Sequence, residues 1–241
     1  MCGRVRIDER KCMEVRAEQI TKDYFRKHGD GNVFTAVDAC DFLLPAGLLT
    51  VVRGKSGSGK STLLNMLSGN LTPTAGHVFY DDADLYSMKD DELSRFRNNN
   101  IGYIPQGRSA VWSLTVLENV MLPLMLYGAR DEKRAVELLE RFNISDLKDE
   151  KISRLSGGEL RRLSIARALI KDPEVIFADE PTGDLDDVNT GIVFEELRGI
   201  ARSGAAVLVV THEEDAAAYA DRMLNMEGGV ISAEDGTTAS Q

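Results

Sequence analysis

The stretch that decides the fold reads Val51-Val52-Arg53-Gly54-Lys55-Ser56-Gly57-Ser58-Gly59-Lys60-Ser61-Thr62. From Gly54 to Ser61 it fits the pattern G-x-x-x-x-G-K-S/T, with an apolar run before it and a helix-like run after it. Strand, loop and helix in that order are the context that a phosphate-binding loop requires, because the glycines let successive N–H groups point inward at a helix N-terminus. A Gly/Ser-rich turn that matches by chance is the alternative, and the two flanks argue against it.

The residues of this loop have separate predicted roles. Lys60 is expected to reach the β- and γ-phosphates of a nucleotide, and the Ser61 hydroxyl is expected to bind Mg²⁺. The expected nucleotide-binding residues are Gly54, Lys55, Ser56, Gly57, Ser58, Gly59, Lys60, Ser61 and Thr62. The loop alone does not say which process uses the nucleotide.

Composition limits the class of protein. The chain has 241 residues, 43% of them hydrophobic and 28% charged, as expected for a globular protein that can bury a sizeable core. The net charge of −10 argues against a general nucleic-acid binder. No run approaches the roughly 18 apolar residues that cross a bilayer, and residues 1–10 lack the apolar segment of a secretory signal. Three cysteines without a C-x-x-C pair fit a reducing compartment. We therefore expect a cytosolic protein without a membrane anchor of its own.

The spacing of apolar and turn residues predicts an α/β domain. Residues 1–17 are expected to be a poorly ordered extension or a variable first strand, and an antiparallel β-layer should follow, with strands at 19–25, 33–37 and 40–44. Ser87 with Asp90 is a possible cap for a helix to about residue 97. Strands are then expected at 77–80, 101–104, 175–178 and 206–210, helices at 156–170, 189–201 and 213–220, and a closing hairpin at 222–226 and 230–231. Strands that alternate with helices favour a mainly parallel sheet.

Residues 106–155 differ in character. Thr115 opens an apolar helix, and residues 131–142 place Ala135, Leu138, Leu139 and Phe142 on one helical face. We expect one domain over 1–241, in which 1–105 and 156–241 form the core with its β-layer and 106–155 form an inserted helical subdomain.

A second motif delivers two acids. Val175-Ile176-Phe177-Ala178-Asp179-Glu180 is an apolar strand with carboxylates at its carboxyl end, where α/β sheets place their ligands. Asp179 is placed to hold Mg²⁺, and Glu180 could polarise the attacking water. By itself such a pair is more often a solvated strand end, but the phosphate loop favours the functional interpretation.

A third motif, Leu155-Ser156-Gly157-Gly158-Glu159, is another anion-binding helix start. Physical reasoning alone would accept a simply capped helix here. Two phosphate-binding helix starts for one nucleotide site make sense if the second one serves the nucleotide of another subunit.

These residues together resemble the ATP-binding subunits of ABC transporters, from about residue 18 to residue 232. Gly54 to Ser61 matches the Walker A motif, Gln106 the Q-loop, and Leu155 to Glu159 the LSGGE form of the signature. Val175 to Glu180 matches Walker B, and the remaining matches are the D-loop at Gly183-Asp184-Leu185-Asp186 and the switch histidine at His212. The resemblance implies a P-loop NTPase fold with a RecA-like core.

Further details are similar to a narrower branch of that family. Residues 178–183, the turn at 73–76 and Leu117-Glu118-Asn119-Val120 resemble ATPases of the lipoprotein-release, macrolide-export and antimicrobial-peptide-resistance type. This implies export or extraction of a lipoprotein, peptide or drug-like cargo. The alternative is a non-transport ATPase that regulates a membrane partner, as the related cell-division ATPase does. A nucleic-acid-associated ABC ATPase is disfavoured, because the chain has neither a long coiled-coil insertion nor a second cassette.

The resemblance also implies a mechanism with ATP and Mg²⁺ as cofactors. Family members form head-to-tail dimers, so Ser156, Gly157, Gly158, Glu159 and the D-loop Asp186 of one subunit would complete the site on Lys60 of a second copy. Within one subunit, Ser61, Gln106 and Asp179 would serve Mg²⁺, while Glu180 and His212, with Lys60 and Gln106, would carry hydrolysis.

Two contacts implied by the family are less closely specified by the sequence. The adenine is expected to stack on Tyr24, with the adjacent Phe25 or a merely packed aromatic as alternatives. An integral membrane permease is expected to dock on the helical insert, with Val111, Trp112 and Leu114 as candidates, although packing within the insert explains them equally well. The protein would then sit at the inner face of the cell membrane. His28 and His77 are expected to be ordinary polar residues.

Overall fold

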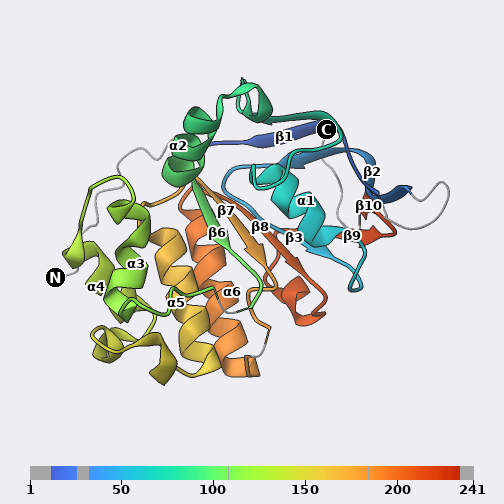
Figure 1. Cartoon of the computed structure of the whole chain (residues 1–241). Helices are drawn as coiled ribbons and strands as arrows, with labels where there is room; N and C mark the ends of the chain where they lie inside the picture. Colours follow the sequence, from blue (N-terminus) through green and yellow to red (C-terminus); the bar gives the residue numbers. More distant parts are fainter. Residues whose placement is uncertain (1–11, 26–32, 108, 184, 234–241) are drawn as a thin grey trace.

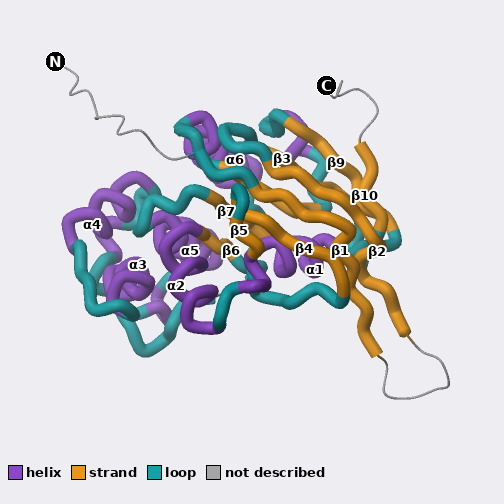
Figure 2. The backbone as a smooth tube through the Cα atoms, turned by 90° about the horizontal axis from the view of Figure 1, so that it is seen from above, coloured by secondary structure: helices purple, strands orange, loops and turns teal. Residues whose placement is uncertain are grey.

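The computed structural model describes residues 12–25, 33–107, 109–183 and 185–233, which form two sheets with a helix between them (Figure 1). The helix, α1 (Lys60–Leu67), lies under a four-stranded antiparallel sheet and on a six-stranded, mainly parallel one. The helices within residues 116–202 pack on the other face of the six-stranded sheet, and the view from above shows them gathered there (Figure 2). The predicted α/β class with an antiparallel layer and a mainly parallel sheet is confirmed.

The antiparallel sheet has the strand order β2-β1-β4-β5. Its strands are β1 (Val15–Phe25), β2 (Val33–Leu44), β4 (Ala75–Tyr80) and β5 (Ala83–Asp84). Of the two alternatives for residues 1–17, the first-strand interpretation fits the last of them, because β1 begins at Val15, whereas residues 1–11 lie outside the described part of the chain. The expectation of two strands at 33–37 and 40–44 is wrong, because β2 is continuous. The β1–β2 ladder absorbs the polar interruption through register shifts, and Gln19, at a φ of 48°, donates its N–H to Asp41.

The second sheet has the order β10-β9-β3-β8-β7-β6, and only β10 runs antiparallel to its neighbour. Its strands are β3 (Leu49–Arg53), β6 (Ile101–Ile104), β7 (Val175–Asp179), β8 (Ala206–Thr211), β9 (Arg222–Glu227) and β10 (Val230–Ala233). Every residue of β7 and β8 is buried, as is typical of parallel strands covered on both faces. The predicted closing hairpin is confirmed as β9 and β10.

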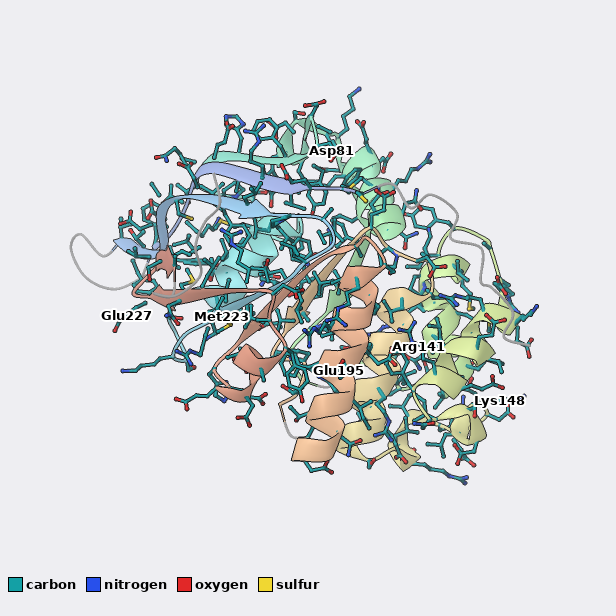
Figure 3. All side chains as sticks on the ribbon, turned by 180° about the vertical axis from the view of Figure 1, so that it is seen from behind. Asp81, Arg141, Lys148, Glu195, Met223 and Glu227 are labelled. Atoms are coloured by element: carbon teal, nitrogen blue, oxygen red, sulfur yellow. The ribbon has the colours of Figure 1, made fainter. Side chains whose placement is uncertain are left out.

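The two faces of this sheet belong to two apolar cores. Val175 and Phe177 of β7 pack with α1 and the antiparallel sheet, whereas Ile176 and Ala178 pack with the helices of the opposite face. Those helices are α3 (Val116–Met125), α4 (Glu132–Arg141), α5 (Gly157–Leu169) and α6 (Asp187–Arg202). In the view from behind, Met223 and Glu227 mark β9 at one end of the molecule, and Lys148 marks the helical part at the other (Figure 3).

The inserted segment is helical, as predicted. Thr115 begins α3 with a capping box to Glu118, and Asp131 caps α4 by accepting from the N–H of Arg134. The short 3₁₀ turns η2 (Ser145–Leu147) and η3 (Ile152–Arg154) lead from α4 to α5. The exact division of the core from an insert at 106–155 stays a prediction.

Two helix predictions are wrong in detail. The helix α2 (Asp90–Asn100) begins after Lys89 without a side-chain cap, and Ser87 instead donates to the carbonyl of Asp84 in the 3₁₀ turn η1 (Leu85–Ser87). Residues 213–220 form only the 3₁₀ turn η4 (Asp215–Ala218). Tyr219 stacks on Phe194, and Asp221 exchanges hydrogen bonds with Leu49, so tertiary anchors override the helical pattern there. No helix in these described residues is long and apolar enough to cross a membrane.

Candidate active site

The phosphate loop joins β3 to α1, and close packing from two other strands requires two of its glycines. Gly59 caps α1 in a left-handed conformation, at a φ of 105°. A Cβ on Gly59 would lie 2.2 Å from the Ala36 carbonyl oxygen of β2, and a Cβ on Gly54 would lie 2.2 Å from the Met226 carbonyl oxygen of β9. Only glycine fits both positions, so the loop is held against its own chain on two sides.

Lys60 is buried at the start of α1, and its ammonium curls over the loop. Its Nζ atom donates to the carbonyl oxygens of Gly54, at 2.6 Å, and Lys55, at 3.0 Å. Burial lowers the pKa of Lys60, while the nearby carboxylates of Glu180 and Asp179 act in the opposite direction. The arrangement places a cation among inward-facing loop groups, where an anion such as a phosphate would be bound.

Ser61 and Asp179 come together across the site. The Ser61 Oγ atom donates to the Asp179 Oδ1 atom at 3.0 Å, which joins the first turn of α1 to the end of β7. Burial raises the pKa of Asp179, and the hydrogen bond from Ser61 opposes that shift. A hydroxyl and a carboxylate are the hard oxygen ligands that Mg²⁺ prefers, so these two residues fit the predicted metal site.

Glu180 and His212 also lie together. The Glu180 carboxylate is buried, and its Oε2 atom lies 2.7 Å from the Nδ1 atom of the more exposed His212. Thr211 donates to the same oxygen at 3.5 Å. The Glu180 backbone is left-handed, at a φ of 49°, a conformation that non-glycine residues adopt rarely. The structure thus brings together the predicted general base and the predicted switch histidine.

Two cavities meet at these residues. One, of about 370 Å³, is lined by the phosphate loop, Gln106, Glu180, Tyr24 and Phe34. The other, of about 640 Å³, is lined by Gln106 and Glu180 again, with residues such as Gly157 and His212. Gln106 and Glu180 therefore form the boundary between a cavity over the loop and a cavity beside α5.

Tyr24 lies on the wall of the loop cavity and is 41% exposed, whereas its neighbour Phe25 is 82% exposed. The sequence analysis missed Phe34, which pairs with Tyr24 across the β1–β2 ladder and lines the same cavity. Only the strand register could have revealed it, because residues that face each other across a ladder share a face of the sheet.

The signature segment starts α5 with a complete capping box. The Ser156 Oγ atom accepts from the N–H of Glu159 at 3.3 Å, and the Glu159 carboxylate accepts from the N–H of Ser156 at 2.7 Å. These hydrogen bonds lower the pKa of Glu159. Gly157 lines the cavity beside α5, a Cβ on Gly158 would lie 3.4 Å from the Leu185 side chain, and neither glycine lines the cavity that contains Lys60.

The D-loop residue Asp186 caps α6, accepting from the N–H of Asn189 at 2.8 Å, and Asp184 lies outside the described residues. His28 also lies outside them, whereas His77 pairs with Asp84 at the surface. The sequence analysis missed Arg161, a buried arginine of α5 whose hydrogen bonds reach the ends of β6 and β7.

Comparisons with known proteins point to one family. The ABC transporter family pattern matches residues 37–183. Over 188 residues the chain is 42% identical to the lipoprotein-releasing system ATP-binding protein LolD of Leptospira interrogans, covering 76% of this chain and 79% of LolD. Over 214 residues it is 37% identical to the macrolide export ATP-binding/permease protein MacB of Chlorobaculum tepidum, covering 88% of this chain. The chain spans 32% of the length of MacB.

A solved structure is similar over nearly the whole chain. The ATP-binding cassette MJ0796, determined as a dimer bound to ADP and Pi in a post-hydrolysis state, superimposes with a TM-score of 0.84 at 32% identity. The likeness covers 92% of this chain and 100% of MJ0796.

Fold and site together are those of a phosphate-loop nucleotide hydrolase, in which the buried Lys60 of the loop and the Asp179 carboxylate lie beside the carboxyl ends of parallel strands. The family match covers more than half of the chain, which therefore belongs to the ABC transporter family. It is an ATP-binding cassette with ATPase activity, and the predicted resemblance is confirmed.

Proposed function

We propose that this ATPase works as a head-to-tail dimer of identical chains, which closes around two ATP molecules and drives a membrane permease. The cargo class follows the relatives, whose names describe lipoprotein release and macrolide export. We therefore assign export or extraction of a lipoprotein, peptide or drug-like molecule. The proposed location is the cytoplasmic face of the cell membrane, where the permease would hold the protein.

The main observation in support of the proposed dimer is the open space around Gly157. A Cβ at this position would meet nothing within 4 Å, and the backbone φ of Gly157 is not positive. Neither packing nor backbone conformation within the chain therefore requires glycine at the start of α5. Close approach of a ligand to the backbone is the other reason for a glycine, and the phosphates of a nucleotide held by a second copy supply such a ligand.

The loop cavity supports the assignment of residues within one subunit. Lys60 and the loop N–H groups would bind the phosphates, and Tyr24 with Phe34 would hold the adenine. Ser61, Asp179 and Gln106 would hold Mg²⁺, which neutralises the charge of the phosphates when it is bound. Glu180 would orient and deprotonate water, and His212 would keep the carboxylate in place through its Nδ1 atom, 2.7 Å away. Ser156, Gly157, Gly158, Glu159 and Asp186 would act on the partner's nucleotide.

The permease would dock on the helical part of the molecule. Trp112 is 56% exposed, Val111 is also exposed, and Leu114 is half-buried, just before α3 begins. An exposed tryptophan beside further apolar side chains is a common centre of protein–protein contacts. Co-purification of a membrane protein with the wild-type chain, and its loss with Trp112→Ala, would support this surface.

The test of the dimer uses Glu180→Gln. This variant keeps the shape of the side chain but removes the base, so ATP should stay bound and the dimer should accumulate. Sedimentation velocity with saturating ATP and Mg²⁺ should show a dimer, and the same variant without nucleotide should be a monomer. A Glu180→Gln chain that stays monomeric in saturating ATP would contradict the proposal.

A further inference from the structure

Arg161 occupies an unusual position in the second turn of α5. Only 5% of its surface is exposed, and its guanidinium donates to backbone carbonyl oxygens of two segments that are far apart in the sequence. On one side, its Nη1 atom donates to Pro105 at 2.7 Å and to Gly107 at 3.4 Å. These two carbonyls flank Gln106, so Arg161 holds the backbone from which that side chain projects.

On the other side the same guanidinium holds the end of β7. Its Nη2 atom donates to the carbonyl oxygens of Asp179, at 3.0 Å, and Glu180, and its Nε atom donates to that of Pro181. Arginine suits this task because its planar group carries five donors in a fixed fork, whereas lysine has one small ammonium.

The peptide that Arg161 holds is strained. A left-handed conformation is unfavourable at a non-glycine residue such as Glu180 and persists only where surrounding contacts enforce it. The N–H of Glu180 donates to the Val210 carbonyl at 2.9 Å, and its own carbonyl accepts from Gly183, at 3.3 Å, as well as from Arg161. Removal of Arg161 would therefore release one of the contacts that aim the Glu180 carboxylate.

We infer that Arg161 is a positioning residue for ATP hydrolysis, because a single guanidinium sets the separation between Gln106 and Glu180. It also belongs to α5, the helix whose first residues would meet the partner's nucleotide. A shift of α5 on dimer closure would thus be passed directly to the two residues on either side of the reacting water. This inference rests on the roles proposed above for Gln106 and Glu180.

The test is Arg161→Met, which keeps an unbranched apolar stem in the same place and removes every donor. We expect kcat for ATP hydrolysis to fall about 30- to 100-fold, since a misplacement of about 1 Å can cost 10²-fold. Nucleotide affinity should change less than about 3-fold, because the loop that binds the phosphates is untouched. Arg161→Lys should lie between, with a loss of about 5- to 10-fold, because an ammonium can serve only one of the two segments well.

Arg167→Met is the matched control on the same helix. Arg167 is half-buried and donates to the carbonyl of Ser109, at 2.8 Å, and to its hydroxyl, at 2.6 Å. It thus holds the segment after β6 but makes none of the described hydrogen bonds to residues 179–181. We expect its kcat to stay within about 3-fold of wild type.

Equal losses of kcat in Arg161→Met and Arg167→Met would overturn the inference, as would a loss that only follows the unfolded fraction measured by thermal melting. If Arg161→Met does not fold, Arg161→Lys decides the matter, and a wild-type kcat in that folded variant would count against the inference. Glu180→Gln distinguishes a failure of the proposed catalytic role of Glu180 from a failure of the inference about Arg161. Normal hydrolysis in Glu180→Gln would refute the role of Glu180 itself, whereas an inactive Glu180→Gln beside a fully active Arg161→Met would refute only the inference about Arg161.

Discussion

The molecule contains two glycine-rich helix starts, at α1 and at α5, and they are built differently. At α1 the chain itself dictates glycine, because carbonyl oxygens of Ala36 and Met226 lie 2.2 Å from where the Cβ atoms of Gly59 and Gly54 would be. At α5 the space beside Gly157 is open. Packing within the chain therefore explains the glycines at α1, whereas the glycine at α5 faces open space, which the partner's nucleotide would fill in the proposed dimer.

Their caps differ in the same way. The N-cap of α1, Gly59, makes no side-chain hydrogen bond, so no capping side chain occupies the helix N-terminus, where an anion can bind. The α5 start is instead capped by its own side chains, through the reciprocal Ser156–Glu159 capping box. Two similar glycine-rich sequences can therefore differ in what their glycines are for. At α1 the glycines are required by packing within the chain, and at α5 they are not.

The largest expected effect belongs to α1. Lys60→Ala removes the cation over the loop, and we expect hydrolysis to fall by about 10²- to 10³-fold or more, as when a transition-state contact is lost. Steady-state phosphate release measures this loss. Lys89→Ala is the control, because that exposed lysine precedes α2 away from the site. Undiminished turnover in Lys60→Ala would refute the assignment of the loop.

The difference between the two helix starts can be tested by substituting one glycine in each, Gly59 at α1 and Gly157 at α5. Gly59→Ala should lower the free energy of unfolding by about 2–4 kcal/mol, because it combines a left-handed alanine with overpacking against Ala36. Gly157→Ala should shift it by less than about 1 kcal/mol, towards higher stability, since alanine favours a helix. In the Glu180→Gln background, however, Gly157→Ala should prevent the ATP-bound dimer. Urea unfolding and sedimentation velocity report the two quantities, and a Gly157→Ala chain that dimerises normally would remove the main support for the sandwich.

The smallest effect concerns the α5 cap. Ser156→Ala should lower the free energy of unfolding by about 0.5–1 kcal/mol at pH 7, the lower part of the range for helix caps because the site is exposed. The pKa of Glu159 is lowered in the folded protein by its bonds to Ser156, so the stabilisation is present above the ordinary carboxyl pKa and is lost as pH falls through the folded-state value. The difference between wild type and Ser156→Ala should therefore shrink in unfolding curves taken from pH 6 down to pH 3.5. An equal difference at both ends of that range would mean that the Glu159 carboxylate does not contribute.

Local sequence was sufficient to predict those parts of the site whose functional groups lie within a few consecutive residues. The phosphate loop, the acids after β7 and the signature could be recognised because each motif contains both its functional groups and the backbone pattern that presents them. The strands of the parallel sheet were equally predictable, because both of their faces are buried and their apolar runs are uninterrupted.

What the sequence could not predict depends on contacts between distant residues. Phe34 reaches the loop cavity only through its register with Tyr24. Arg161 looks like any helical arginine until the carbonyls of residues 105, 107 and 179–181 surround it. Residues 213–220 have a helical pattern, yet Tyr219 and Asp221 are anchored elsewhere. In each case tertiary structure outweighs local preference.

The placement of α1 has a consequence for biosynthesis. This helix spans only Lys60–Leu67, too short to persist alone in water, and it is stabilised by burial between the two sheets. The strand before it, β3, pairs only with β8 and β9, and Gly54 rests against Met226. A nascent chain on the ribosome therefore has no finished phosphate loop until residues 206–227 have emerged. Nucleotide binding by the loop should therefore follow the synthesis of β8 and β9.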